Sequence, residues 1–251
     1  MKLSSILTRA PKDLSKEKIK KKTDSLRLAI AELQNLMYAE NKYSLLVILQ
    51  GMDASGKDGA IKNVFKEVNP IGCRVIPFKK PTDVEMKHDF LWRIHQQVPE
   101  KGMLHVFNRS HYEDVLIQRV HKWIDEDTVK KRYFHINNFE KLLFQNNTIV
   151  LKFFLYVSKE EQLKRLKERL SDKTKMWKYN EGDLKERSFW PQYMKAYEDA
   201  ISNCSAIPWL VVPSDQNWYK DYLIADRIVK ELTKLKMKFP VIKKAESVEK
   251  K

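Results

Sequence analysis

The 251-residue chain is predicted to adopt an α/β fold, a three-layer sandwich in which a five-stranded parallel sheet has helices on both faces. Two observations predict this class: short apolar runs alternate with helical patterns, and no linker or internal repeat divides the sequence. A third is a glycine-rich loop between the first apolar run and the next helical pattern. The predicted strands are residues 43–50, 73–78, 103–107, 148–157 and 207–212.

The segments between these strands carry helical spacing or helix caps. Thr23 is expected to be an N-cap, because apolar residues then recur at helical spacing from Leu26 to Met37. Ser158 is expected to cap a charged helix in the same way. Further helices are expected at 60–68, 83–97, 125–146, 159–170, 184–202 and 218–235. Parallel strands joined by such helices use right-handed crossovers, so their carboxyl ends share one edge of the sheet.

Basic residues are concentrated in three segments of the chain, whose formal net charge is +15. Residues 1–22 carry a net charge of +6, and residues 164–178 and 234–251 carry +5 each. Basic surface indicates polyanionic partners such as nucleic acid, anionic membrane or polyphosphate. The predicted organisation is a basic arm at 1–22, which we interpret as a solvated tail rather than a polyanion contact, a single domain at 23–239 with a lid at about 160–187, and a basic tail at 240–251.

Cysteine and apolar content exclude several classes of protein. Cys73 and Cys204 provide neither metal-ligand spacing nor a disulfide framework, which favours a reduced, cytoplasmic setting. No apolar run approaches the roughly 20 residues of a membrane span. The N-terminus also lacks the apolar core of a signal peptide. We therefore expect a cytoplasmic protein without a membrane partner.

The loop after the first strand has the pattern of a phosphate-binding P-loop. The pattern GxxxxGK[ST] is met at Gly51, Gly56 and Lys57, but Asp58 stands where Ser or Thr is expected. Backbone N–H groups at such a loop and the helix N-terminus cradle phosphate oxygens, and the lysine adds a positive charge. The residues expected to contact phosphate are Gly51, Ala54, Ser55, Gly56, Lys57, Asp58 and Gly59.

Two carboxylates in this loop indicate a cation. A carboxylate inside an anion cradle repels phosphate unless a cation lies between them. Asp53 is therefore predicted to bind Mg²⁺, with Mn²⁺ as an alternative, or to orient an acceptor phosphate. Asp58 fits either a second group near the metal or an acidic residue stabilised by the helix dipole.

The third strand ends at a set of polar residues. Asn108 stands where P-loop enzymes commonly place a magnesium-binding Asp, so Asp53 or Glu113 is expected to supply the missing carboxylate. Arg109 lies at the predicted carboxyl edge of the sheet, where we expect it to contact phosphate. The alternative is an ion pair between Arg109 and Asp83, Glu85 or another local acid.

A basic segment after the fourth strand is interpreted as a lid. Arg165 and Arg169 are one helical turn apart, and lysines continue the cluster to Lys178. A lid of a P-loop kinase brings such cations to the phosphates. A solvated charged helix is the alternative. Among the aromatic residues, Trp177 is a candidate for stacking on a base, whereas the spacing of Tyr193 and Tyr197 favours a helix face in the core.

Taken together, these segments resemble the polyphosphate kinase 2 family. The matching segments span most of the chain in order. They are GMDASGKDG at 51–59, FKKPT at 78–82, HDFLWRIH at 88–95, FNRSHYEDVL at 107–116, INNFE at 136–140, LKFFLYVSKEEQLKR at 151–165 and WKYNEGDLKER at 177–187.

The resemblance implies a P-loop kinase-like fold and Mg²⁺-dependent, reversible transfer of the terminal phosphoryl group of inorganic polyphosphate to a nucleotide. Asn108 with Glu113 resembles the subclass that accepts both AMP and ADP, and GMP and GDP are further candidates. A homodimer or homotetramer is expected. The implied site residues are catalytic Asp53, Lys57 and Arg109; phosphate-binding Lys79, Lys80, Arg165, Arg169 and Lys178 beside the P-loop; nucleotide-binding Asp89, Arg93 and Asn108; and metal-binding Asp53 and Glu113.

Two other functions remain alternatives at this point. An ATP-dependent nucleoside monophosphate kinase would share the P-loop and the lid but has less reason to carry basic tails. A non-enzymatic nucleic-acid-binding module would explain the positive charge. The sequence contains no recognised nucleic-acid-binding motif, so we expect no specific nucleic-acid partner.

Overall fold

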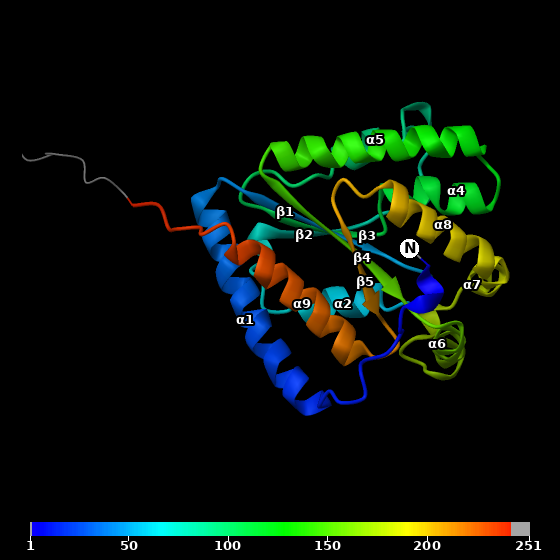
Figure 1. Cartoon of the computed structure of the whole chain (residues 1–251), viewed down its shortest axis with the longest axis horizontal. Coiled ribbons are helices and arrows are strands. Elements are labelled where there is room, and N and C mark those ends of the chain that lie inside the picture. The colour runs from blue at the N-terminus through cyan, green and yellow to red at the C-terminus, as the bar shows by residue number, and fades with distance from the viewer. Residues whose placement is uncertain (1, 242–251) are drawn as a thin grey trace, which may run out of the picture.

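A computed structural model describes residues 2–241 and contains a five-stranded parallel sheet in the order β2-β3-β1-β4-β5 (Figure 1). The strands are β1 (Ser44–Gln50), β2 (Cys73–Pro77), β3 (Leu104–Asn108), β4 (Thr148–Tyr156) and β5 (Trp209–Pro213). The helices are α1 (Lys16–Glu40), α2 (Lys57–Val64), α3 (Trp92–His95), α4 (Ile117–Val120), α5 (Glu126–Gln145), α6 (Lys159–Ser171), α7 (Glu181–Glu186), α8 (Trp190–Asn203) and α9 (Asn217–Thr233). The predicted fold class is confirmed.

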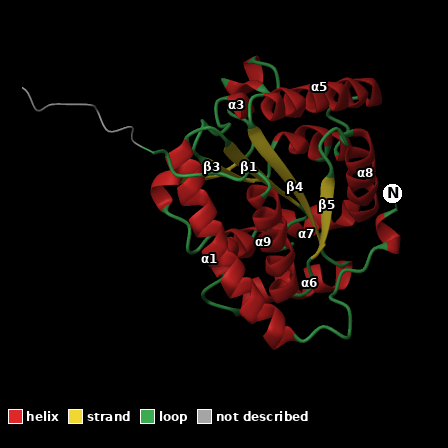
Figure 2. Ribbon diagram, turned by 60° about the vertical axis from the view of Figure 1, so that its left-hand side comes forward, coloured by secondary structure: helices red, strands yellow, loops and turns green. Residues whose placement is uncertain are grey.

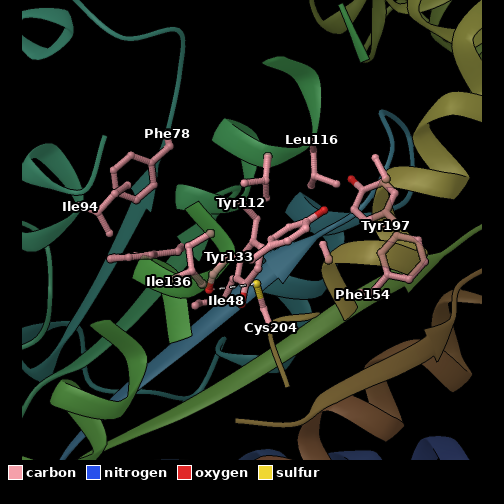
Figure 3. Packing of buried hydrophobic residues seen from close by; sticks show 14 of the residues in the cluster. Ile48, Phe78, Ile94, Tyr112, Leu116, Tyr133, Ile136, Phe154, Tyr197 and Cys204 are labelled. Carbon is pink, nitrogen blue, oxygen red and sulfur yellow. Dashed lines mark hydrogen bonds between the residues drawn. The ribbon is translucent and has the colours of Figure 1, made fainter. Parts of the chain in front are cut away.

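Helices cover both faces of the sheet and create two cores. Helices α1, α2 and α9 lie on one face, and α5 and α8 lie on the other (Figures 1 and 2). Alternate residues of β1 point to opposite sides, so Leu45 and Val47 join one core while Leu46 and Ile48 join the other. Figure 3 shows the second core, where Ile48 lies near Tyr112 and Ile136, and Phe154 stacks on Tyr197. Every residue of β1 is buried, as expected for the central strand.

Strand register brings the functional segments to one edge of the sheet. Leu49 of β1 pairs with Asn108 of β3, and Gln50 pairs with Phe154 of β4. The P-loop leaves the end of β1, and the segment that begins at Arg109 leaves the end of β3. Because both lie at the carboxyl edge, the two sequence motifs meet there.

The N-terminal arm differs from its prediction. Helix α1 begins at Lys16 with Ser15 as its N-cap, whereas the predicted cap Thr23 lies inside the helix and donates its hydroxyl to Ile19 O. Leu3 is buried, so the interpretation of 1–22 as a solvated tail is wrong for the part of the arm that packs on the domain. A threonine hydroxyl can donate to the carbonyl four residues earlier inside a helix as well as cap its start, so the residue type alone does not locate the N-cap.

The arm is joined to the domain by hydrogen bonds from its backbone and side chains. The Leu3 N–H donates to Glu198 Oε1 at 2.7 Å, and the Thr8 hydroxyl donates to Asp215 Oδ2 at 2.8 Å. The other carboxylate oxygen of Asp215 accepts the Ser158 N–H at 2.8 Å, at the N-cap of α6. Asp215 thus connects the arm to the start of the predicted lid helix.

Three predicted helices have different bounds. The segment 83–97 contains only a 3-10 turn at Glu85–Lys87 and the short α3, because the Asp89 carboxylate accepts the Leu91 N–H and breaks the helical path. The segment 184–202 is divided into α7, a 3-10 turn and α8, and α2 runs from Lys57 to Val64 rather than over 60–68. Of the predicted tail 240–251, residues 242–251 lie outside the described part of the chain. None of the helices between residues 2 and 241 is long and apolar enough to cross a membrane.

Candidate active site

A cavity of about 960 Å³ lies at the carboxyl edge of the sheet, between the P-loop, the end of β3 and the segment 165–183. Many basic side chains line it, which suits a highly charged anion. The predicted site residues that line it are Asp53, Ala54, Gly56, Lys57, Asp58, Gly59, Lys79, Lys80, Arg93, Asn108, Arg109, Glu113, Arg165, Arg169 and Lys178. Gly51 and Ser55 lie behind this lining, and Asp89 is exposed outside it.

The backbone of the P-loop requires glycine at two positions, Gly51 and Gly56. Gly56 is in the left-handed region with φ 99°, and a Cβ on Gly51 would lie 2.8 Å from Leu155 O. The Lys57 ammonium turns back into the loop and donates to Gly51 O at 2.7 Å and to Met52 O at 3.1 Å. Burial, aided by the positive charge of Arg109, lowers the pKa of Lys57 to about 8.

Arg109 lies between two carboxylates. Its guanidinium contacts Asp53 of the P-loop directly and lies 3.4 Å from Glu113 Oε2. Glu113 also accepts a hydrogen bond from Gln50 Nε2 at 2.9 Å, which fixes it to the end of β1. Burial opposes the charge of Arg109, but Glu113 and Asp53 more than offset it, so its pKa is raised. Arg109 is therefore a permanent cation. It forms the ion pairs that were the alternative to a phosphate contact, with Asp53 and Glu113 rather than with Asp83 or Glu85.

Asp58 joins three parts of the site. It lies in the first turn of α2, and its carboxylate accepts Asn108 Nδ2 at 2.9 Å and Lys178 Nζ at 2.7 Å. Burial raises the pKa of Asp58, but the hydrogen bonds from Lys178 and Asn108 lower it by more. The residue that breaks the usual P-loop pattern thus connects α2 to the end of β3 and to the basic segment after α6.

The predicted lid arginines share one face of α6 and line the cavity. Arg165 donates to Ala54 O of the P-loop at 3.1 Å and to Ser214 O at 2.7 Å. Arg169 forms an ion pair with Asp183 at 2.6 Å, so it links α6 to α7. The predicted lid segment therefore contacts the P-loop in this structure through the Arg165 guanidinium.

The predicted nucleotide-binding residue Arg93 also lines the cavity. Its side chain is buried, donates to Lys79 O at 2.9 Å and lies 3.8 Å from Asp114 Oδ2. Burial raises the pKa of Asp114 to about 6 despite the nearby arginines. Trp177 lines the cavity and is 77% exposed, whereas Tyr193 and Tyr197 are buried in the core, as their spacing predicts.

The donor atoms in the cavity fit a hard cation shared with phosphate. Within residues 2–241, no group of three histidine, cysteine or acidic side chains is arranged to hold a metal ion. Magnesium, however, commonly takes only one or two carboxylates and completes its shell with water and substrate phosphates. Asp53 and Glu113 face the cavity and supply such carboxylates on either side of Arg109.

The model of the polyphosphate kinase 2 family matches residues 13–240 of the sequence. The chain belongs to the polyphosphate kinase 2 family. It is 49% identical over 217 residues to the AMP/ADP-polyphosphate phosphotransferase of Meiothermus ruber. This match covers 86% of this chain and 81% of that protein. It is 42% identical over 225 residues to the ADP-polyphosphate phosphotransferase of Rhodopseudomonas palustris, covering 84% of this chain and 78% of that protein.

The fold agrees with a solved member of the polyphosphate kinase 2 family. The crystal structure of polyphosphate kinase 2 from Arthrobacter aurescens TC1 has a TM-score of 0.94 and 40% sequence identity. The match covers 97% of this chain and 89% of that chain. This chain is therefore a kinase built on the polyphosphate kinase 2 fold.

The sequence did not predict a buried polar network that joins β4, α5 and the segment after Arg109. Lys152 of β4 and Glu140 of α5 are fully buried and form an ion pair at 2.6 Å. Lys152 also donates to Tyr112 OH, and Glu140 Oε1 accepts the Tyr112 hydroxyl and lies 3.3 Å from His111 Nε2. The network holds the segment that follows Arg109. A lysine inside an otherwise apolar strand was the available signal for it.

Proposed function

We propose that this enzyme transfers the terminal phosphoryl group of inorganic polyphosphate to AMP or ADP, and in reverse from the nucleotide to polyphosphate. The observation that carries the proposal is the convergence of Lys57, Arg109 and Arg165 on one P-loop cavity. A row of fixed cations suits a polymer with a charge on every phosphate. The names of the relatives from Meiothermus ruber and Rhodopseudomonas palustris support the same reaction.

The proposed mechanism assigns binding and charge stabilisation to the residues of this chain. Lys57 exchanges its contacts with Gly51 O and Met52 O for the phosphate that enters the loop. Arg109, already oriented by Asp53 and Glu113, stabilises the charge of the transferring group.

Transfer needs no general base. The bond from the terminal phosphorus to its bridging oxygen breaks, a phosphate oxygen of the acceptor bonds to that phosphorus, and the shortened polyphosphate leaves with the electron pair. The acceptor oxygen is already anionic, so no proton must be removed from it. Positioning and electrostatic stabilisation therefore account for catalysis.

A divalent metal ion is a general requirement of kinases in this family. We propose Mg²⁺, with Mn²⁺ as an alternative, held by Asp53 and Glu113 together with substrate oxygens, where it would neutralise phosphate charge.

Use of both AMP and ADP is proposed from the pair Asn108 and Glu113 and from the relative in Meiothermus ruber. Arg93, which lines the same cavity, is proposed to contact the nucleotide, with GMP and GDP as further acceptors. The role of exposed Asp89 in nucleotide binding stays a prediction. A cytoplasmic location and a homodimer or homotetramer are proposed as well.

The test supplies long-chain polyphosphate and Mg²⁺ with either AMP or ADP, and with no other phosphate donor. We expect ADP from AMP and ATP from ADP, separated by chromatography. Arg109→Ala should lower kcat by about 10³-fold or more, whereas Arg74→Ala, on the exposed edge strand β2, should not. If AMP gives no ADP with polyphosphate but does so when ATP replaces polyphosphate, the result would favour the nucleoside monophosphate kinase. Salt-sensitive DNA binding without turnover would favour the nucleic-acid-binding module.

A further inference from the structure

A fully buried lysine lies directly behind the phosphate-binding loop. Lys220 is in the first turn of α9, and its ammonium donates to Gly56 O at 2.9 Å and to Asn217 Oδ1 at 3.0 Å. The partner in the loop is the glycine that precedes Lys57. A Cβ on Gly56 would lie only 2.7 Å from Lys220 Nζ, and the φ of 99° at Gly56 also favours glycine at this place.

We propose that Lys220 is a positioning residue of the reaction: it holds the Gly56–Lys57 peptide in the phosphate-binding orientation and supplies positive charge behind the cradle. The identity of the bound phosphate chain rests on the proposed function, whereas the contact between Lys220 and Gly56 does not.

The orientation follows from the geometry of the peptide bond. Gly56 O accepts both the Lys220 ammonium and the Ala60 N–H, at 2.9 Å each. In a trans peptide the next N–H points the opposite way, so the Lys57 N–H points out of the start of α2. That is the direction from which a phosphate approaches a helix N-terminus.

The charge behind the cradle belongs to a cluster of fixed groups. Arg165 holds Ala54 O while Lys220 holds Gly56 O, so two cations flank the same turn of the loop. Asp221 lies 3.4 Å from Lys220, and its second oxygen accepts a hydrogen bond from Asn63. Because Lys220 is buried, water screens its field at the loop less than it would screen the field of a surface lysine.

Removing the ammonium alone would leave the Asp221 carboxylate buried without its cation, and this can destabilise the fold for reasons unrelated to positioning. The informative variant is therefore Lys220→Met combined with Asp221→Asn. It keeps the length of the lysine stem, removes both charges and leaves an amide oxygen for Asn63. Lys230→Met, at an exposed position of the same helix, is the matched control.

The experiment measures tripolyphosphate binding by calorimetry, the kcat and KM of the polyphosphate reaction, and the unfolding midpoint. We expect the double variant to unfold near the wild-type midpoint, yet to bind tripolyphosphate at least about tenfold more weakly and to lose up to about 100-fold in kcat/KM. Lys230→Met should bind as the wild type does.

Two outcomes would overturn the proposal. One is a double variant that binds and reacts like the wild type. The other is an equal loss of tripolyphosphate binding in Lys230→Met, because that variant retains Lys220 and its contact with Gly56 O. If wild-type protein binds tripolyphosphate but transfers no phosphoryl group, the proposed function fails while the binding comparison still tests Lys220.

Discussion

The buried ion pair between Glu140 and Lys152 gives a quantitative prediction about stability. Both side chains are 0% exposed, and each also bonds to the Tyr112 hydroxyl. Removing one charge leaves the other buried and uncompensated, which typically costs about 3–5 kcal/mol. We therefore expect Lys152→Met and Glu140→Leu each to lower the free energy of unfolding by about that amount.

The double variant should be far more stable than the sum of the single losses. It carries neither buried charge, so the desolvation cost of the pair disappears. The remaining penalty, taken as about 1–3 kcal/mol, comes from the neutral groups that lose a partner: the Tyr112 hydroxyl, the Cys204 carbonyl and the His111 ring. The two single losses would add to about 6–10 kcal/mol, which requires a coupling free energy of at least about 3 kcal/mol. Adding Tyr112→Phe should recover the part of this loss that comes from the unpaired hydroxyl.

Urea unfolding followed by tryptophan fluorescence measures all four variants at one pH. The slope of free energy against urea concentration must stay constant for the comparison to hold. Strictly additive losses in Lys152→Met and Glu140→Leu would refute the reasoning, as would a single loss below about 1 kcal/mol.

Three further predictions concern the site. The kcat/KM for polyphosphate should fall as pH rises through about 8, since Lys57 then loses the proton that makes it a cation; a pH–rate profile checks this, and a flat profile to pH 10 would contradict it. Folded Asp114 binds its proton more tightly than the unfolded residue, so its contribution to stability should decline as pH rises from about 4 to 6. Comparing urea unfolding of Asp114→Asn and wild type at both ends of this range tests the sign. Asp58→Asn should change the free energy of unfolding by less than about 1 kcal/mol, because its ion pair with Lys178 is partly exposed; a larger loss in the same assay would argue against it.

Local patterns in the sequence were sufficient for the strands and the P-loop. Buried strands such as β1 are apolar on both faces, and the glycine and lysine spacing has one common structural context. The bounds of helices were less predictable. Ser15 caps the start of α1 inside a basic run that lacks apolar periodicity. The turn at Asp89 interrupts a predicted helix although no proline or glycine stands at that point.

Long-range partners explain what sequence reasoning missed in the site. Lys220 reaches Gly56 across 164 residues of sequence, and Arg165 reaches Ala54 across 111. Neither contact follows from the residues that flank these side chains. Arg165 lines the predicted phosphate cavity, but it also donates to the P-loop backbone, which the sequence did not predict. Arg109 lies beside the P-loop because its strand, β3, pairs with β1.

The hydrogen bonds of Asp215 have a practical consequence for handling the protein. One carboxylate oxygen of Asp215 accepts the Thr8 hydroxyl, and the other accepts the Ser158 N–H at the start of α6. A single side chain therefore connects the first residues to the predicted lid helix. An affinity tag that displaces residues 3–8, or a deletion of them, would alter catalytic rates without touching the cavity. Kinetic comparisons between preparations are therefore meaningful only when their amino-terminal extensions are the same.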